Sequence, residues 1–355
     1  MSRAGIKDIA KKANVSIGTV DRVLHNRGQV SKKTKDKVLR IIDELNYVPN
    51  SIASSLATKK EYKIGVLFPT PVDKNTYWYY PAQGIEKAMK ENRDYQIELL
   101  YSYFEINSTL DFTDKANTLL DQKPDGIITA PIYKEELLQI IENCDKSNIK
   151  FALLDSDIES TFRNLYIGQN TKQSGRVAAN LFHYSLNSNS KTPPRILILR
   201  AYSIFQGIPT IYQREEGFRE YFKETEFKTE IITETIEFKP GEDISNKIHS
   251  ILLAYPNIDA IFIPNSKSHL IVPQLKGVSQ RPLVIGFDVL DENRQLMKQG
   301  LIDFLISQRP VVQGYESLNT LLKILIEKRT EPVIKNIPID IITRENLEAY
   351  DHLNL

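Results

Sequence analysis

The feature that most constrains the fold is an alternation of short apolar strands with helix-length segments, which begins at Tyr62 and continues for most of the chain. Apolar strands are predicted at residues 64–69, 97–101, 126–130 and 150–154, and again near 195–199, 228–232, 260–263 and 283–286. Strands separated by helices form parallel sheets that are covered on both faces. Two successive runs predict an α/β core of two doubly wound parallel-sheet lobes.

Polar side chains stand at the ends of several of these strands. Asp155, Asn265 and Asp288 each follow an apolar run. Open α/β sheets bind their ligands at the carboxyl ends of their strands, so these residues are candidates for a binding site. A structural role remains the alternative for each of them, because a strand-end Asp is often only a cap or a hydrogen-bond acceptor.

The first sixty residues differ from the rest of the chain in charge. They hold 13 Lys or Arg and 5 Asp or Glu, a net charge of +8, whereas residues 61–355 hold 33 and 40, a net charge of −7. A basic segment ahead of a mildly acidic body favours a polyanionic partner such as nucleic acid. Charge alone is equally consistent with a solvated basic surface.

This basic head is predicted to consist of short helices. The first covers residues 6–12, the second is capped by Ser16 and covers residues 17–24, and Ser31 caps the third. The core face of the third helix is expected to carry Val38, Leu39, Ile42 and Leu45. Two short helices joined by a tight turn, with a third that closes the core, form the helix-turn-helix plan of a small all-α DNA-binding domain.

The second helix of such a motif enters the major groove with its first residues against the bases. Arg22 can contact guanine through two hydrogen bonds, and Ser16 and Thr19 suit phosphate contacts. Ile17 can pack on a thymine methyl group, whereas Gly18 adds no side-chain contact. The alternative is an ordinary polar surface of a small helical domain.

A further short helix is predicted after Pro49, beginning at Asn50 or Ser51 and carrying Ala53 and Leu56 on its apolar stripe. An exposed leucine at this place can wedge between base steps in the minor groove. Packing of Leu56 against the body is the alternative.

Several segments of the head closely resemble the head of the LacI family of transcription regulators: residues 6–16 (IKDIAKKANVS), 19–24 (TVDRVL), 30–31 (VS), 45–50 (LNYVPN) and 53–57 (ASSLA). The body resembles the family's core, which is similar to type 1 periplasmic sugar-binding proteins. Asp21 and His25 depart from the serine and asparagine usual in the family. Asp21 can accept from a cytosine amino group or repel a phosphate, and the sequence does not decide between these.

The resemblance implies the partners and the mode of action. Family members bind a pseudo-palindromic double-stranded operator as homodimers or tetramers, with Leu56 matching the wedge leucine, and a small molecule changes their operator affinity. The C-terminus has no heptad tail, so we expect a homodimer that associates through the first lobe.

The resemblance also implies the ligand-binding residues. Tyr77 and Trp78 are similarly placed to an aromatic segment of ribose-binding proteins, where rings stack on the C–H face of a sugar. Asp155, Asn265 and Asp288 match ligand-binding positions, as do Arg214 and Gln308. The expected effector is a sugar or a sugar derivative, with no cofactor.

Four domain segments follow: a helix-turn-helix domain at 1–48, a hinge helix and linker at 49–61, a first lobe at 62–166 and 309–326, and a second lobe at 167–308 and 327–355. Crossings between the lobes are expected near Tyr166, Gln308 and Lys328.

The remaining patterns exclude several classes of protein. No run of apolar residues is long enough to span a membrane, and no secretory signal precedes the head, so a cytoplasmic protein is expected. The histidines lack metal-ligand spacing, and neither a Gly-x-Ser-x-Gly elbow nor a P-loop occurs, so neither a metal site nor an enzyme is expected. An enzyme acting on sugars and a transport-associated binding protein remain the alternatives. Specific operator binding by residues 1–60 would separate the latter from a regulator.

Overall fold

The computed structural model describes residues 6–24, 30–45, 60–71, 74, 76–158, 163–186, 192–203, 209–239, 241–275 and 280–352. The chain divides into two compact units, Met1–Thr58 and Lys59–Leu355. These are the head and the core, and each is described by itself.

The described part of the head contains the three predicted helices, α1 (Ile6–Ala13), α2 (Ile17–Leu24) and α3 (Lys32–Glu44). Ser31 caps α3 as predicted, since its side chain accepts a hydrogen bond from the backbone N–H of Thr34. The small core consists of Ile9, Ala10, Ala13, Val20, Val23, Val38 and Ile41.

The prediction for the inner face of α3 was wrong at one position. Leu39 is 40% exposed, and Ile41 is buried in its place. Val38, Ile41, Ile42 and Leu45 have i, i+3, i+4, i+7 spacing, whereas Leu39 lies about 100° further round the helix than Val38.

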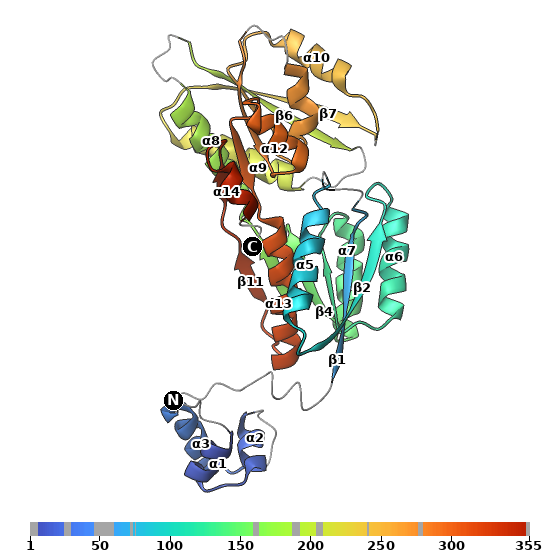
Figure 1. The fold of residues 1–355 in the computed structure, drawn as a ribbon, viewed down its shortest axis with the longest axis vertical. Helices are drawn as coiled ribbons and strands as arrows, with labels where there is room; N and C mark the ends of the chain where they lie inside the picture. The colour runs from blue at the N-terminus through green and yellow to red at the C-terminus, as the bar shows by residue number, and fades with distance from the viewer. Residues whose placement is uncertain are drawn as a thin grey trace. The chain divides into compact units, whose positions relative to one another are not determined.

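The first lobe of the core contains a six-stranded sheet with the order β11-β5-β4-β3-β1-β2 (Figure 1). Its strands are β1 (Glu61–Pro69), β2 (Gln96–Phe104), β3 (Gly126–Thr129), β4 (Lys150–Asp155), β5 (Leu165–Gly168) and β11 (Val333–Asn336). Its helices are α5 (Tyr79–Glu91), α6 (Thr109–Asp121), α7 (Lys134–Lys146) and α13 (Pro310–Glu327).

The second lobe contains a six-stranded sheet with the order β12-β10-β9-β8-β6-β7. Its strands are β6 (Arg195–Ser203), β7 (Glu230–Phe238), β8 (Ala260–Phe262), β9 (Leu283–Phe287), β10 (Phe304–Ser307) and β12 (Asp340–Ile342). Its helical elements are α8 (Thr171–Ser185), α9 (Pro209–Glu224), α10 (Ser245–Ala254), α11 (Ser268–Ile271), η1 (Val272–Leu275), α12 (Asp291–Lys298) and α14 (Leu347–His352).

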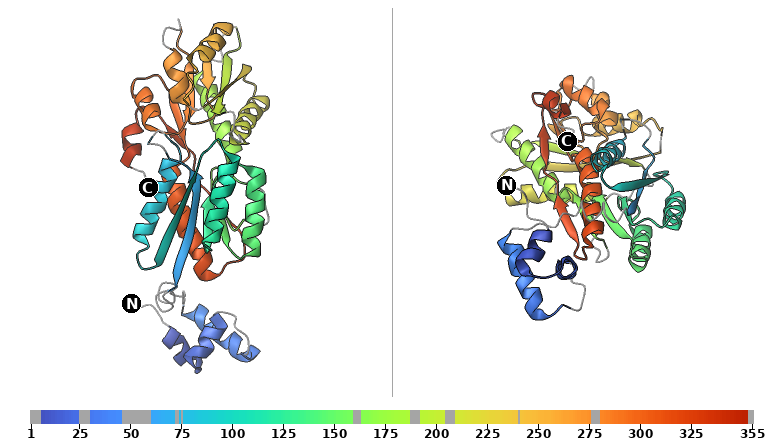
Figure 2. Two further views of the ribbon diagram at one scale, coloured as in Figure 1. Left: turned by 90° about the vertical axis from the view of Figure 1, so that its right-hand side faces the viewer. Right: turned by 60° about the horizontal axis from the view of Figure 1, so that its bottom comes forward.

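Helices cover both faces of each sheet, as the alternation of the sequence predicts (Figure 2). In the first lobe α5 and α13 lie side by side on one face and α6 and α7 cover the other. In the second lobe α8 and α9 cover one face, and α10 to α12 cover the other. All described strand pairs are parallel except β10 with β12.

The chain crosses between the lobes after β5, after β10 and after β11, so the first two crossings lie near Tyr166 and Gln308 as expected. The third expected position was wrong. Val333–Asn336 pairs with Leu165–Gly168 in the first-lobe sheet, so the chain crosses after Asn336 and not at Lys328. The strand was overlooked because its side chains are half-buried or exposed, so its sequence carries no long apolar run.

Candidate functional site

All seven residues predicted for the ligand site line one cleft of about 200 Å³ in the core. The cleft is formed by the carboxyl ends of strands in both sheets, since its walls include residues that directly follow β3, β4, β9 and β10 and residues that lie three to five positions after β8. In parallel sheets these strand ends meet at one edge, which is where open α/β folds bind ligands.

The first lobe contributes Tyr77 and Asp155 to the cleft. The Tyr77 hydroxyl donates to Oδ1 of Asp155 at 2.7 Å, and the backbone N–H of Asp155 donates to Oε1 of Gln313 at 2.8 Å. Asp155 has a φ of 72°, a left-handed conformation that Asp tolerates better than most residues. The carboxylate is therefore held at the strand end by both its side chain and its backbone.

The second lobe contributes a hydrogen-bonded series of three buried side chains. Nη2 of Arg214 donates to Oε1 of Gln308 at 2.6 Å, and Nε2 of Gln308 donates to both Asp288 oxygens at 3.1–3.2 Å. The guanidinium carbon of Arg214 lies 3.8 Å from the centroid of the Phe287 ring. Gln308 thus connects the arginine to the carboxylate, and Asp288 has a φ of 64°.

Burial shifts the ionisation of these groups. It raises the pKa of Asp288 to about 7, and the charge of Arg214 opposes the shift. Burial likewise raises the pKa of Asp155, against the opposing effects of Arg214 and the Tyr77 hydroxyl. Such shifts are common where a site binds a polar ligand away from water.

Two of the predicted residues also have structural contacts. Trp78 is 8% exposed and packs on Phe68, with ring centroids 5.5 Å apart. Nδ2 of Asn265 donates to the Ala201 carbonyl at 2.7 Å, and Oδ1 of Asn265 accepts from the Lys267 backbone at 3.2 Å. Both residues therefore have a structural role as well, although both line the cleft.

Six residues that were not predicted for the site also line the cleft: Ala130, Pro131, Ile132, Ser156, Ser266 and Lys267. Each lies within a few residues of the carboxyl end of a strand. Applying the strand-end rule to every residue after each strand would have found them.

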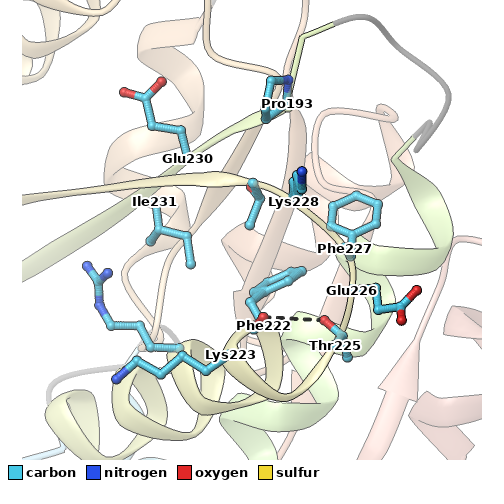
Figure 3. A pocket seen from close by; sticks show the side chains of 11 residues that line it. Pro193, Phe222, Lys223, Thr225, Glu226, Phe227, Lys228, Glu230 and Ile231 are labelled. Atoms are coloured by element: carbon cyan, nitrogen blue, oxygen red, sulfur yellow. Dashed lines mark hydrogen bonds between the residues drawn. The ribbon is translucent and has the colours of Figure 1, made fainter.

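A second hollow, of about 940 Å³, lies elsewhere in the second lobe, between the end of α9 and the start of β7 (Figure 3). Phe222 and Phe227 line it, and both are 8% exposed. Its position at the amino end of β7 is opposite to the strand ends that form the cleft. None of the predicted ligand-binding residues lines it, so we do not assign the ligand site there.

In the head, the residues predicted to contact DNA lie at the start of α2. Ser16, Ile17, Gly18 and Arg22 are exposed, whereas Thr19 and Asp21 are half-buried. The Ser16 hydroxyl accepts from the Thr19 backbone at 3.1 Å and lies 2.9 Å from the Thr19 hydroxyl. Ser16 therefore caps α2 as predicted. His25, Asn50, Ala53 and Leu56 lie outside the described residues.

Family models match both parts of the chain. The bacterial regulatory proteins, lacI family, match residues 5–50, and a periplasmic binding protein domain matches residues 64–329. The chain belongs to the LacI family. This LacI-family protein is a DNA-binding transcription regulator with a periplasmic-binding-protein-like core, as its sequence predicts.

Relatives of similar length support the assignment. The regulator is 26% identical to the ribose operon repressor of Halalkalibacterium halodurans, with 97% of each chain covered. It is 25% identical to the ribose operon repressor of Bacillus subtilis, over 98% of this chain and all of the relative. These relatives are transcriptional repressors by name.

Solved structures agree with the fold. A Bacteroides fragilis chain assigned as a LacI transcriptional regulator has a TM-score of 0.74 at 25% identity, over 82% of this regulator and all of that chain. A solute binding protein of an ABC transporter from Burkholderia graminis, in complex with D-arabinose, has a TM-score of 0.70 at 18% identity, over 81% and 97%. Among the described residues, no helix of the regulator is both long and apolar enough to cross a membrane.

Proposed function

We propose that this regulator is a repressor whose affinity for its operator is controlled by a sugar or a sugar derivative bound in the cleft. The observation that carries the proposal is the convergence of Tyr77, Trp78, Asp155, Arg214, Asn265, Asp288 and Gln308 on one cleft. Carboxylate and amide groups beside aromatic rings suit a ligand that has many hydroxyl groups and an apolar C–H face.

The two lobes supply different parts of this proposed site, so a ligand between them contacts both. Closure of two lobes around a ligand is an established mode of switching. The ligand changes operator affinity to the extent that it binds the operator-competent and the operator-incompetent states with different affinity. Gln313 supports such a coupling, because it accepts from Asp155 of the first lobe and donates to the Gln308 carbonyl at the second crossing.

For the head, we propose that α2 reads bases through Arg22 and Ile17, while Ser16 and Thr19 bind phosphates. A homodimer would place two such helices on the two halves of a pseudo-palindromic operator. Asp21 lies half-buried on the same helix. It stands where the family usually has serine, and we propose that this difference affects which operator is bound.

The first experiment selects bound duplexes from a random pool with the full chain and then measures binding of the selected duplex. Arg22→Ala is expected to weaken binding by about 1–3 kcal/mol and to relax specificity at one base position. Arg40→Ala removes another exposed charge of the head and serves as the matched control. Equal binding by Arg22→Ala and the unmodified chain would contradict the role of α2.

The second experiment adds sugars and sugar derivatives to the protein–operator complex and measures its dissociation constant. A change with one compound, and recovery of that compound intact after incubation, would support a sensor. Turnover of the bound compound would favour the enzyme alternative.

A further inference from the structure

Lys267 is a cleft residue that the proposed sugar site does not use. It lines the cleft two residues after Asn265, beyond the carboxyl end of β8. Its backbone N–H donates to Oδ1 of Asn265, which fixes the turn that precedes α11. The side chain is half-buried, so the cation is held in the wall of the cleft and not on an open surface.

The two cations of the cleft have very different surroundings. Arg214 is balanced by the charges of Asp155 and Asp288 and donates to Gln308 and to the Pro264 carbonyl. Lys267, by contrast, makes no ion pair or side-chain hydrogen bond with any residue that the structure describes. Burial alone lowers the pKa of Lys267, and no neighbouring carboxylate offsets it.

Two titratable groups close in sequence or structure to this turn, His269 and Glu292, do not neutralise the ammonium. The charge of Lys267 contributes, after burial, to lowering the pKa of His269, so the two groups disfavour each other's cationic forms. Glu292 lies 3.8 Å from Nε2 of His269 and is itself exposed. Within the described residues the cleft therefore holds one cation whose partner is missing.

A desolvated ammonium without a counter-charge is costly, so a protein keeps one where an anion arrives with a ligand. The carboxylates of the cleft already face Arg214, and the pKa of Asp288, near 7, leaves that carboxylate partly protonated at neutral pH. Nε of Arg214 is also buried and has no partner among the described residues, so a second donor in the same wall is unused. The electrostatics of the free cleft thus favour a ligand with negative charge.

We infer that the effector is a polyhydroxylated compound that carries an acidic group, a carboxylate or a phosphate, and that Lys267 binds this group. The inference rests on the proposed sensing of a sugar derivative in the cleft and specifies its chemical class. The hydroxyl groups are bound by Asp155, Asp288 and Asn265, and the acidic group lies against the turn after β8.

The test compares matched neutral and acidic compounds by isothermal titration of the full chain. Three sets suffice: D-glucose, D-glucuronate and D-glucose 6-phosphate; D-galactose, D-galacturonate and D-galactose 6-phosphate; D-ribose, D-ribonate and D-ribose 5-phosphate. In one set an acidic member is expected to bind at least about tenfold more tightly than its neutral counterpart, the gain of one charge-assisted hydrogen bond. Whether the carboxylate or the phosphate member binds distinguishes the two acids.

Variants assign the preference to Lys267. Lys267→Met keeps the length of the side chain and removes its charge, and it is expected to abolish the preference for the acidic member. Lys267→Arg is expected to retain most of it. Lys323→Met, at an exposed position of α13, is the matched control and is expected to bind as the unmodified chain does.

The outcomes separate this inference from the proposed function. Tight binding of a neutral sugar, with no gain from an acidic group, overturns the inference and leaves sugar sensing standing. An acidic preference that survives in Lys267→Met overturns the role of Lys267. If no compound of either charge binds, sugar sensing fails and the inference fails with it.

Discussion

The two lobes of the core share one architecture but differ in chemistry. Their sheets have corresponding strand orders, in which β4 and β9 occupy the same place. Asp155 ends β4 and Asp288 directly follows β9, and both have left-handed backbones with φ of 72° and 64°. From the same position in its sheet, each lobe thus presents to the cleft one carboxylate whose residue has a strained, left-handed backbone.

What surrounds each carboxylate is different. Asp155 has a tyrosine hydroxyl beside it and aromatic residues nearby, whereas Asp288 is 2% exposed and connected through Gln308 to a buried arginine. The second lobe also supplies Lys267. The architecture fixes where a polar residue can stand, and the side chains at those places decide whether a lobe offers an aromatic wall or a charged one.

The largest expected effect comes from removing the Asp288 carboxylate, which is linked through Gln308 to Arg214. Asp288→Ala should weaken effector binding by about 2–5 kcal/mol, because it leaves Arg214 and Gln308 buried without their partner. Asp155→Ala should cost less, since Asp155 is only half-buried whereas Asp288 is 2% exposed. Titration of both variants with the effector measures the difference, and operator binding without effector should be unchanged in both. A response of Asp288→Ala at the concentration that suffices for the unmodified chain would refute the assignment of the site.

The next prediction tests whether tight helix packing affects effector binding in the second lobe but not in the first. A methyl group at Gly175 of α8 would lie 1.8 Å from the Arg214 carbonyl, and one at Gly84 of α5 would lie 2.0 Å from the Val311 carbonyl. Both Gly→Ala variants should lower the free energy of unfolding by about 1–3 kcal/mol, because the helices must move apart.

Only Gly175→Ala should also weaken effector binding, because its clash falls on the backbone of a cleft residue. Chemical denaturation and titration of the two variants provide the comparison, with Gly84→Ala as the control. Equal loss of effector binding in both would mean that the lobes are not mechanically distinct.

The smallest expected effect is a change in the free energy of unfolding with pH. In the folded protein the pKa of Asp288 lies near 7, above its ordinary value, so the folded state binds more protons than the unfolded state between about pH 4 and 7. The contribution of this group to stability is therefore present in full at acidic pH and is lost as pH rises through 7. The slope is at most about 1.4 kcal/mol per pH unit.

Asp288→Asn should lack this slope, so its stability relative to the unmodified chain should rise between pH 5 and pH 8. Denaturation at several pH values measures the difference. A constant difference across this range would show that the carboxyl group does not titrate there.

Much of the architecture could be predicted because it depends on local patterns. The helices of the head and most strands of both lobes follow from apolar periodicity, and the expected strand at 228–232 begins within two residues of β7 but extends further, to Phe238. The strands β5, β10, β11 and β12 were not predicted as strands. The strands β5 and β10 lie next to crossings between the lobes and were interpreted as crossing segments, whereas β11 and β12 are mostly half-buried or exposed and carry no long apolar run.

The sequence by itself determined which residues stand at the strand ends, and a resemblance added Arg214 and Gln308 to them. Parallel strands make this possible, because their carboxyl ends meet at one edge wherever the helices lie. Only the tertiary structure decided how these residues are connected. Gln308 joins Arg214 to Asp288 across 94 and 20 residues of sequence, and no local pattern encodes such separations.

The charge of the cleft was likewise decided by the tertiary structure. In the sequence, Lys267 is one of many lysines, and nothing near it in the chain marks it as a cation without a partner. Its pairing depends on which carboxylates the fold brings within reach, and the described acids of the cleft face Arg214 instead. Residue identity is local, but the balance of charge in a site depends on electrostatic interactions through space. Their energy falls with the distance between the charges, and packing sets that distance.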